Sequence, residues 1–131
     1  MKNIPLTSSV MEQQPHRASS LPVRDMEHAL NVAGGSKRLA DKIFFELQQE
    51  LPKQLDSMRQ QAAENNRDAL WNIAHRMHGS TALCGVPALN QAVEKLEHAI
   101  KGARAEEIDR ELEQVAAEIN RLRRSQPLHM A

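Results

Sequence analysis

The stretch Ala74-His75-Arg76-Met77-His78-Gly79-Ser80-Thr81-Ala82-Leu83-Cys84-Gly85 decides how this chain of 131 residues folds. On an ideal helix, at about 100° per residue, the apolar side of this segment spans an arc of about 80°. That arc holds Leu70, Ile73, Met77, Thr81 and Cys84. His75 lies about 150° from the centre of the arc, with Gly79 beside it one turn later. Glycine in mid-helix costs roughly 0.5–1 kcal/mol relative to alanine, and open space beside the imidazole for a bulky partner would explain its presence.

The same helical pattern continues on both sides of this segment. Helices are expected from Val23 to Val32, Ser36 to about Glu64, Asn65 or Asn66 to Leu83 or Cys84, Pro87 to Gly102, and about Ala105 to Arg124. The apolar stripe of the second helix is Leu39, Ile43, Leu47, Leu51, Leu55 and Met58. We expect Pro52 to bend that helix, because its ring removes a hydrogen bond. Four long amphipathic helices with short turns predict an all-α fold, an antiparallel up-down four-helix bundle with a short extra N-terminal helix.

Composition fits one helical domain with tails. Aromatic residues are limited to Trp71, Phe44 and Phe45, and the 17 basic and 17 acidic residues cancel, so nothing draws the chain towards nucleic acid or a membrane surface. A single cysteine on the apolar arc, Cys84, is expected to be a buried structural thiol. We expect residues 1–22 to be a flexible linker or lead-in, residues 23–125 the domain, and residues 126–131 a frayed tail.

The motif Ala74-His75-x-Met77-x-Gly79-Ser80, followed by Gly85, resembles the phosphoacceptor helix of a histidine phosphotransfer (HPt) domain. The resemblance runs from about Met26 to Leu122. It includes Gly34-Gly35-Ser36, Pro52, Asn66-Arg67-Asp68 and Leu96-Glu97. One position departs from the family pattern, because His78 stands where lysine is usual. Within the family, the chain looks most similar to the C-terminal HPt module of hybrid sensor histidine kinases.

This resemblance implies that His75 accepts a phosphoryl group from a receiver-domain aspartate and passes it to a second receiver. Gly79 would give clearance for the receiver, while Arg76 and His78 would flank the phosphoryl group or meet the receiver. Trp71, about 110° from the centre of the apolar arc, is either a half-buried edge residue or part of the docking patch. The histidine helix itself offers no general base, although an exposed imidazole is largely unprotonated near neutral pH. We expect transfer to depend more on pH than in relatives with lysine at position 78, because histidine is cationic only when protonated.

The chain also lacks a glycine-rich nucleotide loop, a Walker lysine motif and an acidic metal-binding cluster. It is therefore expected to be a carrier and not an enzyme, without a cofactor of its own, while the partner receiver supplies magnesium. If the chain is part of a hybrid sensor kinase, the parent protein would be a histidine kinase, and residues 1–22 favour that origin over a free-standing carrier. We expect a cytoplasmic monomer, or one tethered to the inner membrane through such a parent, with receiver domains as partners and no contact with nucleic acid or lipid.

Two alternatives stay open on the sequence alone. The chain could be a helical interaction module that binds receivers or a partner helix without being phosphorylated. His75 and His78 also have the i, i+3 spacing found in some metal sites, but no further ligand is nominated. The remaining histidines, His16, His28, His98 and His129, are expected to be surface or tail residues.

Overall fold

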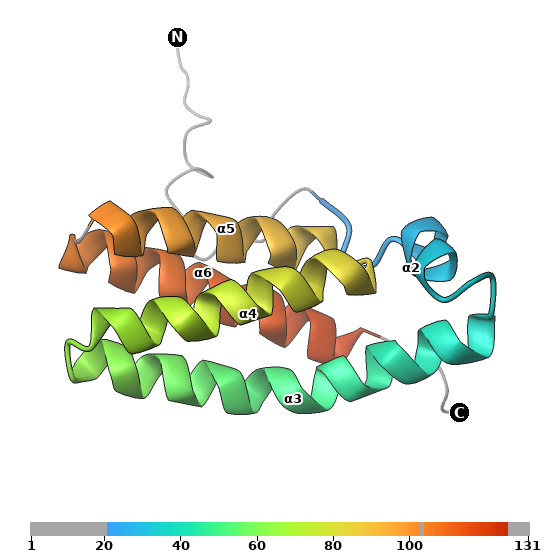
Figure 1. Ribbon diagram of the computed structural model, residues 1–131, viewed down its shortest axis with the longest axis horizontal. Coiled ribbons are helices and arrows are strands. Elements are labelled where there is room, and N and C mark those ends of the chain that lie inside the picture. The colour runs from blue at the N-terminus through green and yellow to red at the C-terminus, as the bar shows by residue number, and fades with distance from the viewer. Residues whose placement is uncertain (1–20, 103, 126–131) are drawn as a thin grey trace, which may run out of the picture.

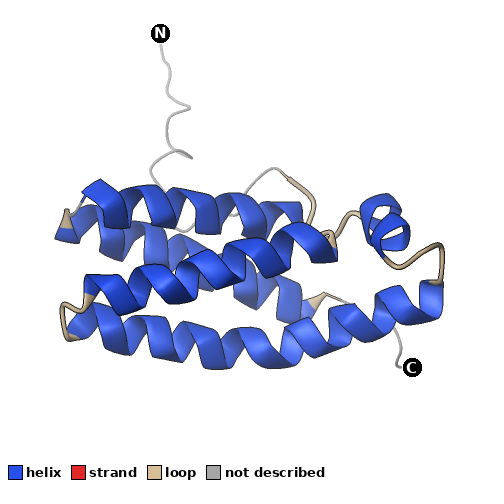
Figure 2. Cartoon of the chain, in the orientation of Figure 1, coloured by secondary structure: helices blue, strands red, loops and turns tan. Residues whose placement is uncertain are grey.

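A computed structural model describes residues 21–102 and 104–125 of the chain. Within these ranges the chain forms five α-helices and no strand (Figures 1 and 2). The helices are α2 (Met26–Val32), α3 (Lys37–Ala63), α4 (Arg67–Cys84), α5 (Pro87–Gly102) and α6 (Ala105–Arg124). This confirms the predicted all-helical fold. The expected lead-in, except residues 21 and 22, and the expected tail lie outside the described residues.

Four long helices surround a common apolar core. Helix α3 contacts α4 and α6, and α5 contacts the same two helices, so each long helix has two neighbours (Figure 1). The interior holds large side chains that are almost completely buried, among them Phe44, Leu51, Met58, Leu70, Met77, Leu89, Leu96 and Leu122. Burial of this apolar surface is the main favourable contribution to folding.

Local sequence signals explain where the helices begin and end. Ser36 and Asn66 each cap a helix, because their side-chain oxygens accept the backbone N–H three residues later, at 3.0 and 3.2 Å. Gly85 ends α4 in the left-handed conformation, with φ of 69°. One predicted boundary is wrong: the first helix begins at Met26 and not at Val23, because the Asp25 side chain accepts from the N–H of His28 and caps it.

The predicted core face of α3 is wrong in its first turns. Leu39 is 44% exposed and Ile43 is only partly buried, while Ala40 and Phe44 turn inwards. The reason is geometric, because each step of four residues advances about 40° beyond a full turn, so a stripe spaced by fours drifts off the core. The helix runs through Pro52 without a break, and its first half rises towards α2 in Figure 1.

Helix α2 covers the end of the structure where α4 stops and α3 begins. The N–H of Asp25 donates to the Gly85 carbonyl at 2.7 Å, and the His28 ring contacts the Ala82 carbonyl oxygen through Nε2 at 2.8 Å. Close packing requires glycine at 85, because a Cβ there would lie 2.8 Å from the Asp25 carbonyl oxygen. None of the helices within the described ranges has the length and apolar character needed to cross a bilayer.

Candidate functional site around His75 and Glu97

Helix α4 places His75 on the outside of the structure. The neighbouring Ala74 is fully buried, with Leu70, Met77 and Thr81 on the same side, so the face that carries His75 turns away from the core. The His75 side chain is 59% exposed. The predicted outward orientation of this imidazole is confirmed.

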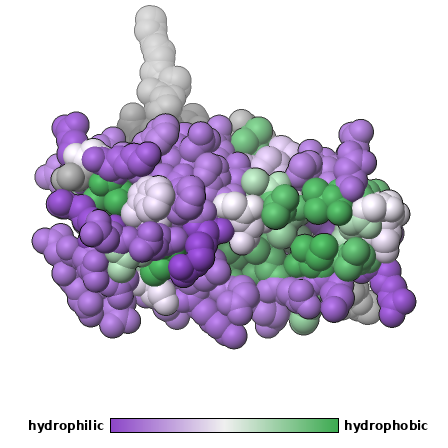
Figure 3. Space-filling model, in the orientation of Figure 1, coloured by the Kyte–Doolittle hydropathy of each residue, from purple (hydrophilic) through white to green (hydrophobic). Residues whose placement is uncertain are grey.

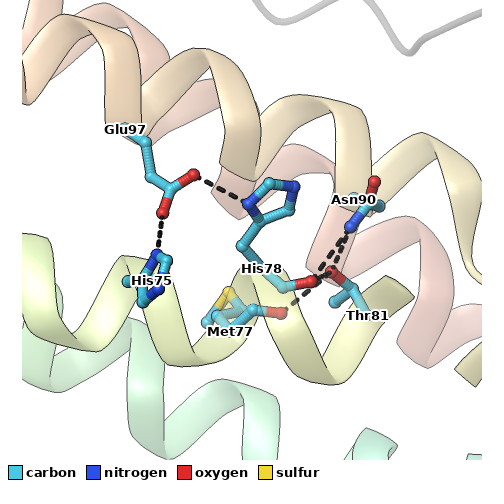
Figure 4. A network of polar contacts seen from close by, with 6 residues as sticks. All are labelled: His75, Met77, His78, Thr81, Asn90 and Glu97. Carbon is cyan, nitrogen blue, oxygen red and sulfur yellow. Dashed lines mark hydrogen bonds and ion pairs between the residues drawn. The ribbon is translucent and has the colours of Figure 1, made fainter. Parts of the chain in front are cut away.

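The adjacent helix supplies a carboxylate that bridges two histidines (Figure 4). Glu97 follows the buried Leu96 on α5, and its side chain is only 10% exposed. Its Oε2 lies 2.8 Å from Nδ1 of His75, and its Oε1 lies 2.8 Å from Nδ1 of His78. An ionised carboxylate can only accept hydrogen bonds, so each ring donates its Nδ1–H and keeps an unprotonated Nε2 when neutral.

Trp71 lies against the other side of the phosphoacceptor candidate. One helical turn before His75, its indole stacks on the imidazole with ring centroids 4.5 Å apart and planes inclined by 12°. Lys101, at the end of α5, places its Nζ 5.9 Å from the centre of the indole ring. Trp71 is partly buried against the core, which agrees with the predicted half-buried edge position.

The other predicted site residues of α4 differ in their exposure. Arg76 and Gly79 are exposed, and a Cβ added at Gly79 would meet nothing within 4 Å. His78 is less accessible, with 30% of its side chain exposed, because it turns towards α5 and Glu97. The structure therefore brings His75 and His78 together through Glu97 and leaves Arg76 facing solvent.

A second polar network braces the helix beyond the two histidines (Figure 4). The Thr81 hydroxyl donates to the Met77 carbonyl at 2.9 Å, and the Asn90 amide donates to the His78 carbonyl at 3.1 Å and to Thr81 Oγ1 at 3.0 Å. These bonds tie the backbone beside Gly79 to α5.

Glu97 and Asn90 were absent from the predicted site. Leu96-Glu97 belongs to the family resemblance, which gives it no role here, and periodicity along one helix cannot reveal a partner on another. Cys84 also differs from expectation, because it is only partly buried, although its burial still raises the pKa of the thiol. Within the described ranges, no group of three or more His, Cys, Asp or Glu side chains is arranged to hold a metal ion.

Comparison with known families places the chain in a family. The model of the family described as "Hpt domain" matches residues 42–125, which include α4, α5 and α6. The chain belongs to the Hpt domain family. Hpt domains are phosphotransfer carriers of two-component phosphorelays that interact with receiver domains, and they lack the catalytic site of an enzyme.

Relatives of this Hpt domain occur in sensor kinases. It is 31% identical over 123 residues to the sensor histidine kinase GacS of Pseudomonas protegens, a match covering 84% of this chain and 13% of the kinase. It is 27% identical over 101 residues to the signal transduction histidine-protein kinase BarA of Escherichia coli K12, covering 76% of this chain and 11% of that protein. The chain thus spans a small part of the relatives that it matches.

A solved structure has the same fold. The crystal structure of the HPT domain from a sensor hybrid histidine kinase of Shewanella superposes with a TM-score of 0.67 at 20% sequence identity. The superposition covers 77% of this chain and 87% of the other. At this level of identity the likeness establishes the fold.

Proposed function

We propose that this Hpt domain accepts a phosphoryl group on Nε2 of His75 from the aspartate of one receiver domain and passes it to a second receiver. The observation that carries the proposal is the Nδ1 contact with Glu97, which leaves Nε2 as the nucleophilic nitrogen. This nitrogen belongs to a side chain that is 59% exposed, so a donor has access to it.

Glu97 also suits the charge that develops during transfer. The lone pair of Nε2 forms the new N–P bond, and the P–O bond to the donor aspartate breaks, so the aspartate leaves as a carboxylate. The proton on Nδ1 stays in place, and the phosphorylated ring gains positive charge. A carboxylate 2.8 Å from Nδ1 stabilises that charge. The same contact is present when the phosphoryl group is transferred from His75 to the second receiver.

The donor protein must supply the groups that activate the phosphoryl group for transfer. No nucleotide-binding motif occurs in the sequence. We therefore infer that magnesium and the groups that bind the phosphoryl oxygens belong to the receiver, and that this chain carries no cofactor.

The outer face of α4 suits the docking of such a receiver. Gly79, one turn after His75, leaves open space, and Leu83, one turn further along the same stripe, is 62% exposed. Leu83 borders a shallow apolar groove with Val32 of α2 and Ile43 of α3. In Figure 3 apolar side chains gather over α2, the end of α4 and the start of α3. Exposed apolar surface of this kind marks a protein-binding site.

We further propose that the four long helices form an antiparallel up-down bundle, and that the domain acts as a cytoplasmic monomer or as part of a membrane-tethered parent sensor kinase. The neighbour contacts of α3 to α6 and the short turns support the bundle. The match to GacS over 13% of the kinase supports a parent protein of that class.

The proposed function is tested by labelling. The full chain is mixed with receiver domains from the same genome, each phosphorylated with acetyl phosphate and magnesium. We expect acid-labile, alkali-stable label on the native chain, loss of the label in His75→Gln, and retention in the control His98→Gln, an exposed histidine of α5. Binding of receivers without any labelling would instead identify an interaction module that is not phosphorylated.

A further inference from the structure

Trp71 makes a contact with His75 that ordinary core packing does not explain. Its indole lies nearly parallel to the imidazole, at 12°, with 4.5 Å between the ring centroids. Helical spacing places these side chains on the same face, since they are four residues apart. The indole therefore covers one face of the ring whose edge Glu97 holds.

Hydrogen bonding by the indole nitrogen does not explain why a tryptophan stands at position 71. Its Nε1 is buried without a hydrogen-bond partner within the described residues, which is an unfavourable arrangement. The indole also borders an open hollow lined by Arg67, Asp68, Ile100 and Lys101, so it does not simply fill a gap in the core. The flat ring surface that faces His75 is the feature that remains to be explained.

We propose that Trp71 is a positioning residue for phosphoryl transfer, which holds the His75 ring so that Nε2 and not Nδ1 meets the donor. This inference rests on the proposed function, because it assumes that His75 is the phosphorylated residue. Glu97 holds Nδ1, but this single hydrogen bond to an exposed ring can break, and the ring can then turn and present Nδ1. A parallel aromatic ring at 4.5 Å restricts that rotation.

The stack also favours the product of the reaction. A ring phosphorylated on Nε2 that retains its Nδ1–H carries positive charge, and the face of an indole attracts a cation. The neutral ring gains less from the same contact. Trp71 thus supports the phosphorylated state as well as the orientation of the attacking nitrogen.

The test uses phosphoramidate, a small phosphoryl donor that needs no protein partner. Nε2 of His75 forms the N–P bond, the P–N bond of phosphoramidate breaks, and ammonia leaves. Because no receiver docks, the rate of phosphorylation depends on the His75 ring and its surroundings and not on receiver binding. The variants are Trp71→Leu, which removes the stack, and Trp71→Phe, which keeps a flat ring, while Asn72→Ala on exposed α4 surface is the matched control.

Phosphorylation of Trp71→Leu is expected to be about two- to tenfold slower than that of the control, the range expected for loss of one aromatic stack. Phosphorus and long-range proton–nitrogen NMR should then find a mixture of Nδ1 and Nε2 adducts. Trp71→Phe should restore the native rate within about twofold and Nε2 as the single position, because a phenyl ring still stacks. A merely structural role of Trp71 would not change which nitrogen is phosphorylated.

NMR of the unmodified chain provides a measurement that does not depend on the leucine variant folding. Ring protons of His75 should be shifted upfield by the indole and should lose most of this shift in Trp71→Leu. A native chain without the upfield shift, or a folded Trp71→Leu with the control rate and Nε2 adduct only, overturns the inference while His75 remains the acceptor. A native chain that neither phosphoramidate nor any receiver can label overturns the proposed function itself.

Discussion

His75 and Glu97 lie on different helices, yet Nδ1 of the histidine is 2.8 Å from Oε2 of the glutamate. The same carboxylate reaches His78 through its other oxygen at 2.8 Å, so one nearly buried acid organises both imidazoles. The carboxylate holds one edge of an exposed imidazole and, when ionised, selects the tautomer that carries its proton on Nδ1. A carrier that must both accept and release a phosphoryl group needs such a fixed nitrogen.

Replacing Glu97 with glutamine should slow transfer to His75. Glutamine keeps the size of the side chain but loses the negative charge and one of the two accepting oxygens. Hydrogen bonds to charged groups contribute about 1.5–3 kcal/mol, and about 1.4 kcal/mol corresponds to tenfold in rate, so we expect at least about a tenfold decrease. The measurement is the single-turnover rate from a phosphorylated receiver.

Glu94→Gln is the matched control for this variant, because Glu94 is an exposed acid on the same helix. It changes the net charge by the same amount and should leave the rate within about twofold, as expected for an exposed charge. Equal slowing in both variants would show that overall charge, and not the contact with Nδ1, governs transfer.

The elements that were predictable from sequence depend on local chemistry. Ser36, Asn66 and Gly85 fix the ends of α3 and α4 through hydrogen bonds and backbone conformation that involve only residues nearby. The outward orientation of His75 follows from the buried residues of its own helix. Its stack with Trp71 also had a sequence signal, since i, i+4 spacing brings the two rings to the same face.

The pairing with Glu97 depends on how α4 and α5 are shifted and rotated against each other. Periodicity gives the buried face of each helix, but not which turn of one lies opposite which turn of the other. From the sequence alone, a glutamate next to Leu96 therefore looks like any acidic residue at the edge of the apolar face of its helix. Its role becomes visible only when both helices are placed. The exposure of Leu39 has a different origin, because a stripe spaced by four residues drifts around the helix by about 40° at each step.

Substitution of Gly79 by alanine should raise stability and lower transfer. A Cβ there meets nothing within 4 Å, and alanine in mid-helix is favoured over glycine by about 0.5–1 kcal/mol. The added methyl group would nevertheless project into the space that the receiver needs beside His75. Urea denaturation and single-turnover transfer from a receiver measure the two effects, and phosphoramidate labelling should be unchanged.

Gly85→Ala should have the opposite effect on stability from Gly79→Ala. Gly85 has φ of 69°, and an added Cβ would lie 2.8 Å from the Asp25 carbonyl oxygen, so this variant should be destabilised by more than about 1 kcal/mol. Unaltered transfer in Gly79→Ala would mean that the glycine is not needed for clearance, whatever its effect on unfolding.

His78→Lys should change how transfer depends on pH. An imidazole changes its charge across the range from about pH 6 to 8, whereas lysine stays cationic. The ratio of the native rate to the variant rate should therefore fall as pH rises, because only the lysine variant keeps a permanent positive charge near the phosphoryl group. Parallel profiles between pH 6 and 8 would exclude a special role for His78 in the pH response.

Asp41 gives the fold a pH-dependent link between α3 and the segment before α2. Its carboxylate lies 3.2 Å from Arg24 and 3.2 Å from Lys37. Burial alone would raise the pKa of Asp41, but the hydrogen bonds and charges of Lys37 and Arg24 outweigh it, and the pKa falls below its usual value. The ion pairs therefore stabilise the folded state above the unfolded pKa, and this contribution is lost as pH falls through the folded pKa.

Asp41→Asn should accordingly be less stable than the native chain by about 1 kcal/mol above about pH 5, and the difference should shrink towards zero as the native carboxylate is protonated below about pH 4. Urea midpoints measured from pH 3 to 7 test this, with Asp56→Asn as the control, because Asp56 is an exposed acid on the same helix. A stability difference that stays constant over the whole range would attribute the effect of Asp41→Asn to packing, because loss of an ion pair must follow the ionisation of its acid.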